Sequence, residues 1–237
     1  MTSIEPIDGS DLYASRVLRW PQSVSNLEQK QAVAARAAAL VADGQIVGIG
    51  SGSAAYLSLW AIGARVREEG LAIRLVTASY ETQAAALRLS LPVMPLGSVE
   101  PDWGVDGADE VTADGRLLKG RGGAMFLEKV LWSTARRMYL AVDPSKHVQS
   151  LGVGFPVPVE VDRVAVDLLA RRLDGLGARS YELRLAAGKD GPVITESGNL
   201  IIDAWFDQIE VGLHASLKSL PGVIETGLFE GYEFELL

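Results

Sequence analysis

The sequence contains no cysteine, and its only histidines are His147 and His214. The lack of cysteine excludes disulfide bonds, thiolate zinc sites and cysteine nucleophiles, and it is compatible with a reducing cytosol. Both histidines lie far along the chain from the acidic and glycine-rich segments described below, and neither is assigned a role. Any catalysis would therefore depend on carboxylates, lysines and backbone groups.

Long apolar runs and an excess of positive charge are also missing. No apolar run reaches the length of a membrane span, and residues 1–24 carry acids without the apolar core of a secretory signal. The net charge of −8 argues against nucleic acid or an anionic membrane as the main partner. We therefore expect a cytoplasmic globular protein that binds a small molecule, with residues 1–24 as a surface extension.

The sequence does contain short apolar runs that alternate with helical segments. Ser25 and Glu28 have capping-box spacing at the start of the first helix. The alternation predicts right-handed β-α-β units, and hence an α/β fold with a Rossmann-like, mostly parallel sheet and helices on both faces. The predicted strands are 45–50, 73–79, 92–96, 103–105 and 138–143, and the predicted helices are 27–42, 51–70, 81–90 and 124–137; residues 112–119 form a hairpin.

The pattern changes near Leu151, where a second domain is expected. Its elements have the order β-α-β-β-α-β, which predicts a smaller, ferredoxin-like α+β domain over residues 152–229 with a role in oligomerisation. Asp207 and Glu210 are expected to cap its second helix. Residues 230–237 would return to the first sheet as an edge strand, so the first domain comprises 25–151 and 230–237.

Polar and glycine-rich segments follow successive strands of the predicted parallel sheet. The carboxyl ends of such strands face one common crevice, so these segments should meet there. They are GSGS (50–53), TASYE (77–81), DGADE (106–110) and VDPSK (142–146).

The segment GIGSGSAA (48–55) suits anion binding, because glycines let the backbone approach a ligand and the following helix offers unpaired N–H groups. It also matches the weak dinucleotide pattern G-x-G-x-x-A. However, the second strand ends at Thr77-Ala78-Ser79 without the acid that would hold a ribose, so a single phosphate is favoured over a dinucleotide. The alternative is a tight turn without any ligand.

Glu128 is the strongest candidate for a base. At about 100° per residue, Lys129 and Ser133 fall on one side of the helix and Glu128 falls on the apolar side with Leu131. Partial desolvation should raise the pKa of Glu128 and make it a base near neutral pH. The alternative is a buried glutamate in a structural ion pair.

The other acids and Lys119 have several possible uses. Asp106 and Asp109 flank Gly107-Ala108, so a tight turn can aim both into the crevice, whereas Glu110 is expected to be a solvated cap. Lys119 can stabilise a developing oxyanion, or it can be a surface lysine at a hairpin end. Magnesium is a rival use of the carboxylates, although their spacing fits no EF-hand, and we expect no metal.

A phosphate site, a desolvated carboxylate and a lysine together suit aldose–ketose interconversion of a sugar phosphate. The base moves a proton between two neighbouring carbons through an enediolate, and cations hold the negative oxygen without a metal. Rival functions are isomerisation of another sugar phosphate, a non-catalytic sugar-phosphate sensor, and a nucleotide-linked oxidoreductase.

The motifs between residues 27 and 229 resemble the A type of ribose-5-phosphate isomerase. In chain order they are GIGSGS, DGADEV, LKGRGGAMFLEK, VDPSK, FPVPVEV, TESGN and PGVIETGLF. The resemblance implies interconversion of D-ribose 5-phosphate and D-ribulose 5-phosphate in the pentose phosphate pathway. It also implies a homodimer or homotetramer that needs no metal or organic cofactor.

The resemblance also implies roles for individual positions. Glu128 would be the proton acceptor, with Asp106, Asp109 and Lys119 beside it as catalytic residues. The implied substrate-binding residues are Lys30, Ser51, Gly52, Ser53, Ala54, Gly107, Ala108, Gly120, Arg121, Gly122 and Lys146. The family's phosphate loop usually reads G-T-G-S-T, so Ala54 lacks a hydroxyl. The loss of one hydrogen bond to a phosphate predicts roughly ten- to hundredfold weaker binding.

Overall fold

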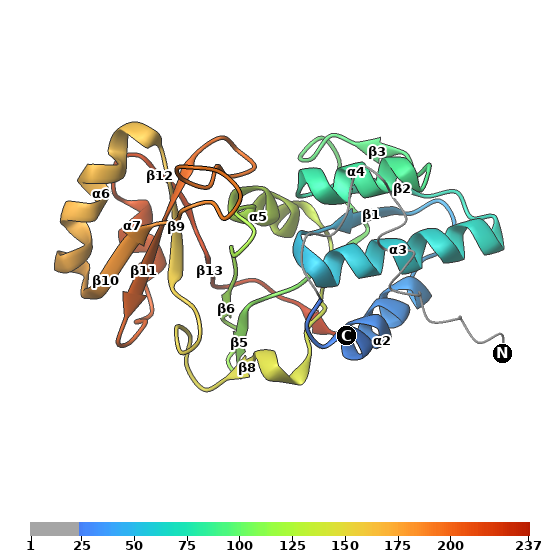
Figure 1. Cartoon of the computed structure of the whole chain (residues 1–237). Coiled ribbons are helices and arrows are strands. Elements are labelled where there is room, and N and C mark those ends of the chain that lie inside the picture. The colour runs from blue at the N-terminus through green and yellow to red at the C-terminus, as the bar shows by residue number, and fades with distance from the viewer. Residues whose placement is uncertain (1–23) are drawn as a thin grey trace.

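The computed structural model describes residues 24–237, so the extension expected at residues 1–24 lies outside the described part except for Val24. Two lobes are visible in Figure 1, one built on a parallel sheet and one on an antiparallel sheet. Between residues 24 and 237, no helix combines the length and the apolar character that a membrane span requires.

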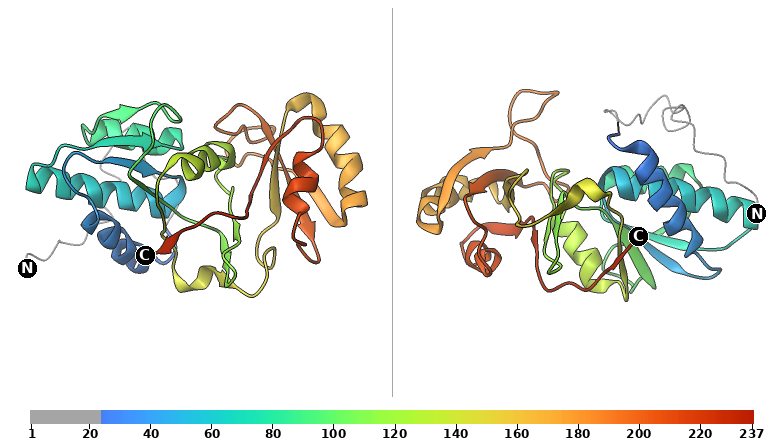
Figure 2. Two further views of the ribbon diagram at one scale, coloured as in Figure 1. Left: turned by 180° about the vertical axis from the view of Figure 1, so that it is seen from behind. Right: turned by 90° about the horizontal axis from the view of Figure 1, so that it is seen from below.

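The sheet of the first lobe has the strand order β14-β7-β4-β1-β2-β3, and every neighbouring pair is parallel. This confirms the predicted parallel sheet and the return of the C-terminal residues to its edge, which Figure 2 shows as the red segment crossing between the lobes. The strands are β1 (Ile46–Ile49), β2 (Arg74–Thr77), β3 (Val93–Met94), β4 (Trp103–Asp106), β7 (Met138–Leu140) and β14 (Glu235–Leu236).

Helices cover both faces of this sheet, as predicted. On one face, α2 (Leu27–Ala39), α3 (Gly52–Glu69) and α4 (Tyr80–Arg88) pack their alanine- and leucine-rich sides on β1, β2 and β4. On the other face, Leu131 of α5 (Met125–Thr134) packs against β2. The sheet is therefore buried on both sides, which explains why its strands are continuous apolar runs.

The predicted capping box at the start of α2 is wrong. The N-cap is Asn26, in a left-handed conformation with φ 52°, and its side chain makes no capping hydrogen bond. The Ser25 hydroxyl instead accepts a hydrogen bond from Lys30 Nζ at 3.2 Å, and the Ser25 carbonyl accepts another at 2.8 Å. Ser25 thus orients a lysine of the predicted site.

The second lobe has the predicted β-α-β-β-α-β order, and its sheet order β10-β11-β9-β12 is the ferredoxin-like arrangement. Its helices cover one face and bury the aliphatic side chains of β9 and β11. The elements are β9 (Val157–Val161), α6 (Val166–Leu173), β10 (Ala178–Leu183), β11 (Leu200–Phe206), α7 (Leu213–Lys218) and β12 (Val223–Thr226), with 3-10 turns at Arg163–Ala165 and Asp174–Leu176.

The predicted caps of α7 are wrong. The helix begins at Leu213 after Gly212, whose φ of 94° is a conformation that suits glycine, and no side chain caps it. Asp207 lies at the surface, where its Oδ1 is 3.4 Å from Arg179 Nη1.

A small third sheet, with the order β13-β6-β5-β8, connects the lobes. The predicted hairpin forms between β5 and β6 and turns at Gly115. Glu110 is not the solvated cap that we expected, because its buried carboxylate accepts the N–H groups of Gly152 at 2.5 Å and Gly154 at 2.6 Å. The strands are β5 (Glu110–Thr112), β6 (Leu117–Leu118), β8 (His147–Val148) and β13 (Leu228–Phe229), and Pro144–Lys146 is a 3-10 turn.

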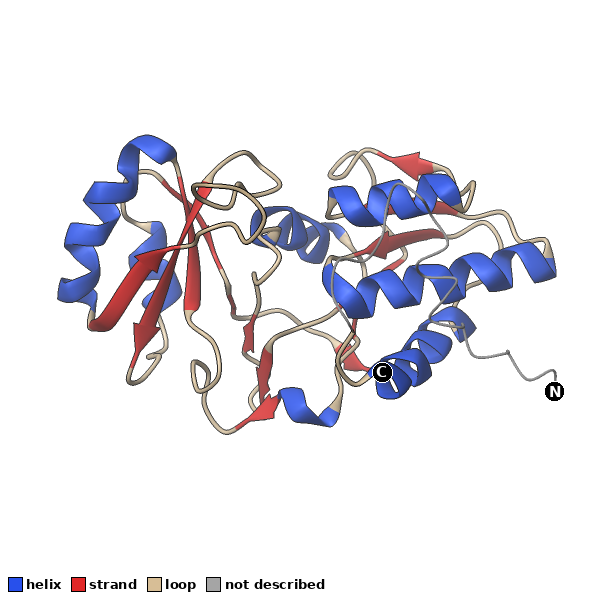
Figure 3. Cartoon of the chain, viewed as in Figure 1, coloured by secondary structure: helices blue, strands red, loops and turns tan. Residues whose placement is uncertain are grey.

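Helix α5 lies between the two lobes, as Figure 3 shows, so both of its sides are covered. Lys129, on the side away from Glu128, is only 6% exposed. Its Nζ is 2.8 Å from Oε1 of Glu225 on β12. This ion pair fixes the helix that carries Glu128 to the second lobe.

We expect Lys129→Met to lower the free energy of unfolding by about 3–5 kcal/mol, because it leaves the Glu225 charge buried with weaker partners. Lys129→Met combined with Glu225→Leu should recover most of this loss. Arg136→Met, which removes two exposed pairs, with Glu100 and Asp102, is the control and should cost at most about 1 kcal/mol. Urea unfolding measures all of these variants. A Lys129→Met loss no larger than the control's would show that the buried pair does not hold the lobes together.

Candidate active site

A cavity of about 470 Å³ opens where the strands β1, β2, β4 and β7 end. Its wall includes Ser51, Glu81, Asp109 and Lys146, one residue from each of the four segments that were expected to converge. The predicted common crevice is therefore confirmed, and its geometry follows from the parallel strands.

The cavity brings together the predicted site residues, with one exception. Those that line it are Lys30, Ser51, Gly52, Ser53, Ala54, Gly107, Ala108, Asp109, Lys119, Gly120, Arg121, Gly122, Glu128 and Lys146. Asp106 is the exception, because it is fully buried beneath the wall. This arrangement gathers the residues in one place, and their chemical roles stay predictions.

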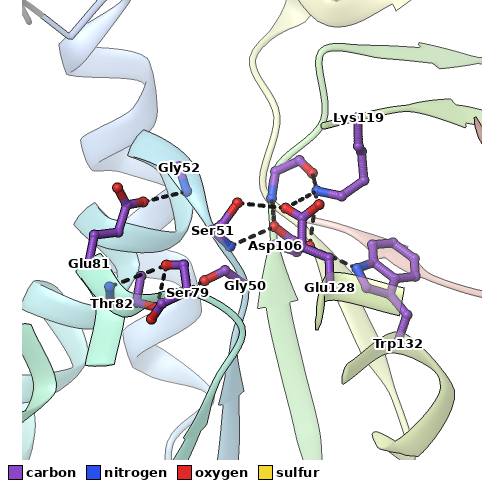
Figure 4. Close-up of polar contacts among 11 residues, drawn as sticks. Gly50, Ser51, Gly52, Ser79, Glu81, Thr82, Asp106, Lys119, Glu128 and Trp132 are labelled. Carbon is purple, nitrogen blue, oxygen red and sulfur yellow. Dashed lines mark hydrogen bonds and ion pairs between the residues drawn. The ribbon is translucent and has the colours of Figure 1, made fainter. Parts of the chain in front are cut away.

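The expectation that Asp106 points into the crevice is wrong, because its carboxylate is used inside the protein. Oδ1 accepts the N–H of Gly107 at 2.8 Å and that of Ser51 at 3.3 Å. Oδ2 accepts the indole N–H of Trp132 at 2.9 Å and lies 2.9 Å from Lys119 Nζ. Figure 4 shows Asp106 joining the glycine-rich loop, Lys119 and α5.

The glycine-rich loop must approach Asp106 closely, and this explains Gly50. A Cβ atom built on Gly50 would lie 2.2 Å from the Asp106 carboxyl carbon. Any larger residue at position 50 would therefore push the carboxylate away from the loop. Gly52 has φ +76°, a conformation that residues with a Cβ rarely adopt, and it starts α3 directly after Ser51.

Glu128 lies in the first turn of α5 and is 2% exposed. Its Oε1 accepts the Ser51 hydroxyl at 2.7 Å and lies 3.1 Å from Lys119 Nζ. Its Oε2 is buried without a hydrogen-bond partner among residues 24–237. Burial raises the pKa of Glu128 to about 7, although the Lys119 charge opposes this shift. The desolvated carboxylate predicted from the helical projection is confirmed.

Lys119 is 3% exposed, so it is not the surface lysine of the alternative interpretation. Its ammonium contacts Asp106, Glu128 and the carbonyl oxygen of Gly107. Burial alone would lower the pKa of Lys119, but the Asp106 and Glu128 carboxylates outweigh burial and raise it above its usual range. Lys119 is therefore positively charged at neutral pH and gives the cavity a fixed cation.

Charges at the cavity rim are mixed. Lys30, Arg121 and Lys146 bring positive charge, whereas Asp109 is an acid whose pKa is raised by burial against the pull of Lys119 and Lys146. No group of three or more His, Asp or Glu side chains within residues 24–237 is arranged as a metal site.

Sequence reasoning missed Glu81 as a member of the site. Its Oε1 accepts the N–H of Gly52 at 2.9 Å, and the side chain lines the cavity. A signal was present, because the segment TASYE (77–81), which ends in Glu81, was expected at the crevice.

We expect the ¹³C carboxyl signal of Glu128 to titrate near pH 7. The folded protein then binds this proton more tightly than the unfolded chain does, so this group's contribution to stability falls as pH rises from about 4.5 to about 7. Ser51→Ala should move the midpoint upward, because it removes a donor to the ionised carboxylate. Ser53→Ala is the matched control and should leave the midpoint unchanged, and Glu128→Gln assigns the signal. A midpoint near 4.5 would contradict the desolvated environment.

The sequence model of ribose 5-phosphate isomerase A (phosphoriboisomerase A) matches residues 74–236. The ribose-5-phosphate isomerase A of Methanothermobacter thermautotrophicus is 41% identical over 204 residues, which cover 85% of this chain and 89% of the relative.

Solved structures agree with the sequence comparison. Ribose 5-phosphate isomerase A from Methanocaldococcus jannaschii has a TM-score of 0.85 and 36% identity, and the match covers 90% of this chain and 95% of the other. A D-ribose-5-phosphate isomerase in complex with phospho-erythronic acid has a TM-score of 0.82 and 36% identity, with 85% of this chain and 90% of the other covered. The buried Glu128, its lysine and the loop above them thus lie in a chain that belongs to the ribose 5-phosphate isomerase A family.

Proposed function

We propose that this chain is an aldose–ketose isomerase that interconverts D-ribose 5-phosphate and D-ribulose 5-phosphate in the pentose phosphate pathway. Its relatives carry the name ribose-5-phosphate isomerase A, and one structural neighbour was solved with phospho-erythronic acid, a phosphorylated sugar acid. The cavity of about 470 Å³ has the size of a small-molecule site and combines anion-attracting groups with a buried base.

The observation that carries the proposal is Glu128, a buried carboxylate with a pKa raised to about 7 in the cavity wall. At this pKa, a large fraction of the side chain is ionised at neutral pH, and the proton that it accepts can be released again. Hydrogen bonding and ion pairing hold Oε1, so Oε2 is the oxygen that remains to accept a proton.

We assign Glu128 the proton transfer between the two reacting carbons. From the aldose, Glu128 Oε2 removes the proton on the carbon next to the carbonyl, and the electron pair moves to form the enediolate. Glu128 then gives that proton to the former carbonyl carbon, while the hydroxyl proton of the second oxygen passes to the enediolate oxygen, so that a ketone and a new hydroxyl form. The reaction is an internal redistribution and consumes no other reactant.

Lys119 would stabilise the enediolate oxygen. It is positively charged and lies 3.1 Å from Glu128, so its ammonium is close to where negative charge develops. Asp109, whose pKa is raised, would exchange the hydroxyl protons. We give Asp106 a positioning role, because all its contacts orient the lysine, the loop and α5.

The phosphate group would bind at the start of α3, in the loop Ser51–Ala54. The first-turn N–H groups of a helix and the Ser53 hydroxyl suit an anion. Lys30, Arg121 and Lys146 add positive charge around the same cavity. Binding at this remote end would hold the reacting carbons next to Glu128.

An assay of ribose 5-phosphate isomerisation in the presence of EDTA tests the function directly. We expect full activity in EDTA, and in D2O the product should acquire deuterium at the carbon that receives the proton. Activity only with another sugar phosphate would contradict the substrate assignment. Loss of activity in EDTA that magnesium restores would contradict the proposal that no metal is needed.

We expect Glu128→Gln to lower turnover at least about a hundredfold while substrate affinity stays near normal. The amide keeps the shape and the hydrogen bond from Ser51 but cannot accept the proton in the transition state. Steady-state kinetics and calorimetric substrate binding measure the two effects separately. A variant with near-normal turnover would remove Glu128 from the mechanism.

We further propose, from the family resemblance, a cytoplasmic homodimer or homotetramer in which the second lobe serves assembly. Light scattering of the purified protein measures the number of chains directly.

A further inference from the structure

The loop proposed to bind phosphate has several of its hydrogen-bond donors already occupied by carboxylates. Asp106 accepts the N–H of Ser51, Glu128 accepts its hydroxyl, and Glu81 accepts the N–H of Gly52 at 2.9 Å. Ser53 and Ala54 follow in the first turn of α3, where N–H groups have no partner within the helix. Ala54 has no hydroxyl to add. The loop therefore has fewer free donors than its glycine-rich sequence suggests.

Glu81 differs from the two other carboxylates in its place and its partners. Asp106 lies below the wall of the cavity, and Glu128 is held by Lys119. Glu81 lines the cavity itself, and no lysine or arginine forms an ion pair with it among the described residues. Its negative charge therefore acts directly on the space where an anion would bind.

We propose that Glu81 is an affinity-determining residue that competes with the substrate's phosphate group for the Gly52 N–H. This inference rests on the proposed function, which places the phosphate at Ser51–Ala54. The carboxylate occupies one donor of the loop and repels a dianion at the same point. Substrate binding then requires the Glu81 carboxylate to release the Gly52 N–H or to share this donor with the phosphate group.

The surroundings of Glu81 support a competing role over a purely structural cap. Lys30, Arg121 and Lys146 line the same cavity and attract an anion, so the carboxylate of Glu81 offsets part of their charge. Burial raises the pKa of Glu81, and the nearby Glu196 charge adds to this effect, although the Gly52 N–H opposes it. Glu81 is thus held near other negative charge, and no lysine or arginine among residues 24–237 forms an ion pair with it.

Two replacements of Glu81 separate the effect of its negative charge from the effect of its hydrogen bond with the Gly52 N–H. Glu81→Gln keeps an oxygen that can accept the Gly52 N–H and removes the charge, whereas Glu81→Ala removes both. We expect inorganic phosphate to bind about five- to thirtyfold more tightly to Glu81→Gln than to the wild type, and at least as tightly to Glu81→Ala. The KM for ribose 5-phosphate should fall in parallel.

Glu196→Gln is the matched control. Glu196 accepts the N–H of the neighbouring Tyr80 at 3.0 Å, but it does not line this cavity, so its replacement should change phosphate affinity less than twofold. Isothermal titration calorimetry with inorganic phosphate measures affinity, and thermal unfolding reports whether each variant is folded. A gain of affinity is an effect that damage to a structural cap cannot produce.

Phosphate affinity of Glu81→Gln equal to or weaker than that of the wild type would overturn the proposal, as would a complete lack of phosphate binding by both. If Glu81→Ala does not fold, Glu81→Gln alone decides. The result is also separable from the proposed function. If Glu81→Gln binds phosphate more tightly but the wild type does not isomerise ribose 5-phosphate, the role of Glu81 is retained and the proposed function is rejected. If the wild type isomerises ribose 5-phosphate but Glu81→Gln binds phosphate no more tightly, the function is retained and the role of Glu81 is rejected.

Discussion

The buried ion-pair cluster of Lys119 with Asp106 and Glu128 is the interaction on which the rest of the site depends. The Lys119 ammonium lies 2.9 Å from the Asp106 carboxylate and 3.1 Å from the Glu128 carboxylate, and all three side chains are almost completely buried. Such a cluster is stable only if every partner is fixed by further contacts. The fold supplies these contacts from the loop after β1, from Trp132 on α5 and from the hairpin that carries Lys119.

The same cluster explains how one carboxylate becomes a base while its neighbour stays a structural acceptor. Asp106 receives two N–H groups and an indole N–H, so its negative charge is well compensated. Glu128 keeps one oxygen without a partner, and burial raises its pKa. The different environments of two acids around one lysine thus divide their proposed roles between support and proton transfer.

The sequence predicted the parallel sheet, the ferredoxin-like second lobe and the common crevice, because these depend on local patterns and on the fixed geometry of parallel strands. The apolar projection of α5 also located Glu128 correctly. The sequence could not show that Asp106 is buried beneath the glycine-rich loop, because its contact with Ser51 joins positions distant in the chain. It could not show that Lys129 is buried either, because its partner Glu225 is also distant in the chain. Of the third sheet, only the hairpin of β5 and β6 was predicted, because the two-residue strands β8 and β13 join it through tertiary contacts.

The final strand has a practical consequence for handling the protein. β14 pairs with β7 along the outer side of the first sheet, and Leu237 donates its N–H to Leu140. Without this segment, β7 would present an open row of backbone groups, which is a template for aggregation. Truncation before Glu235 is therefore expected to make the protein more prone to aggregate.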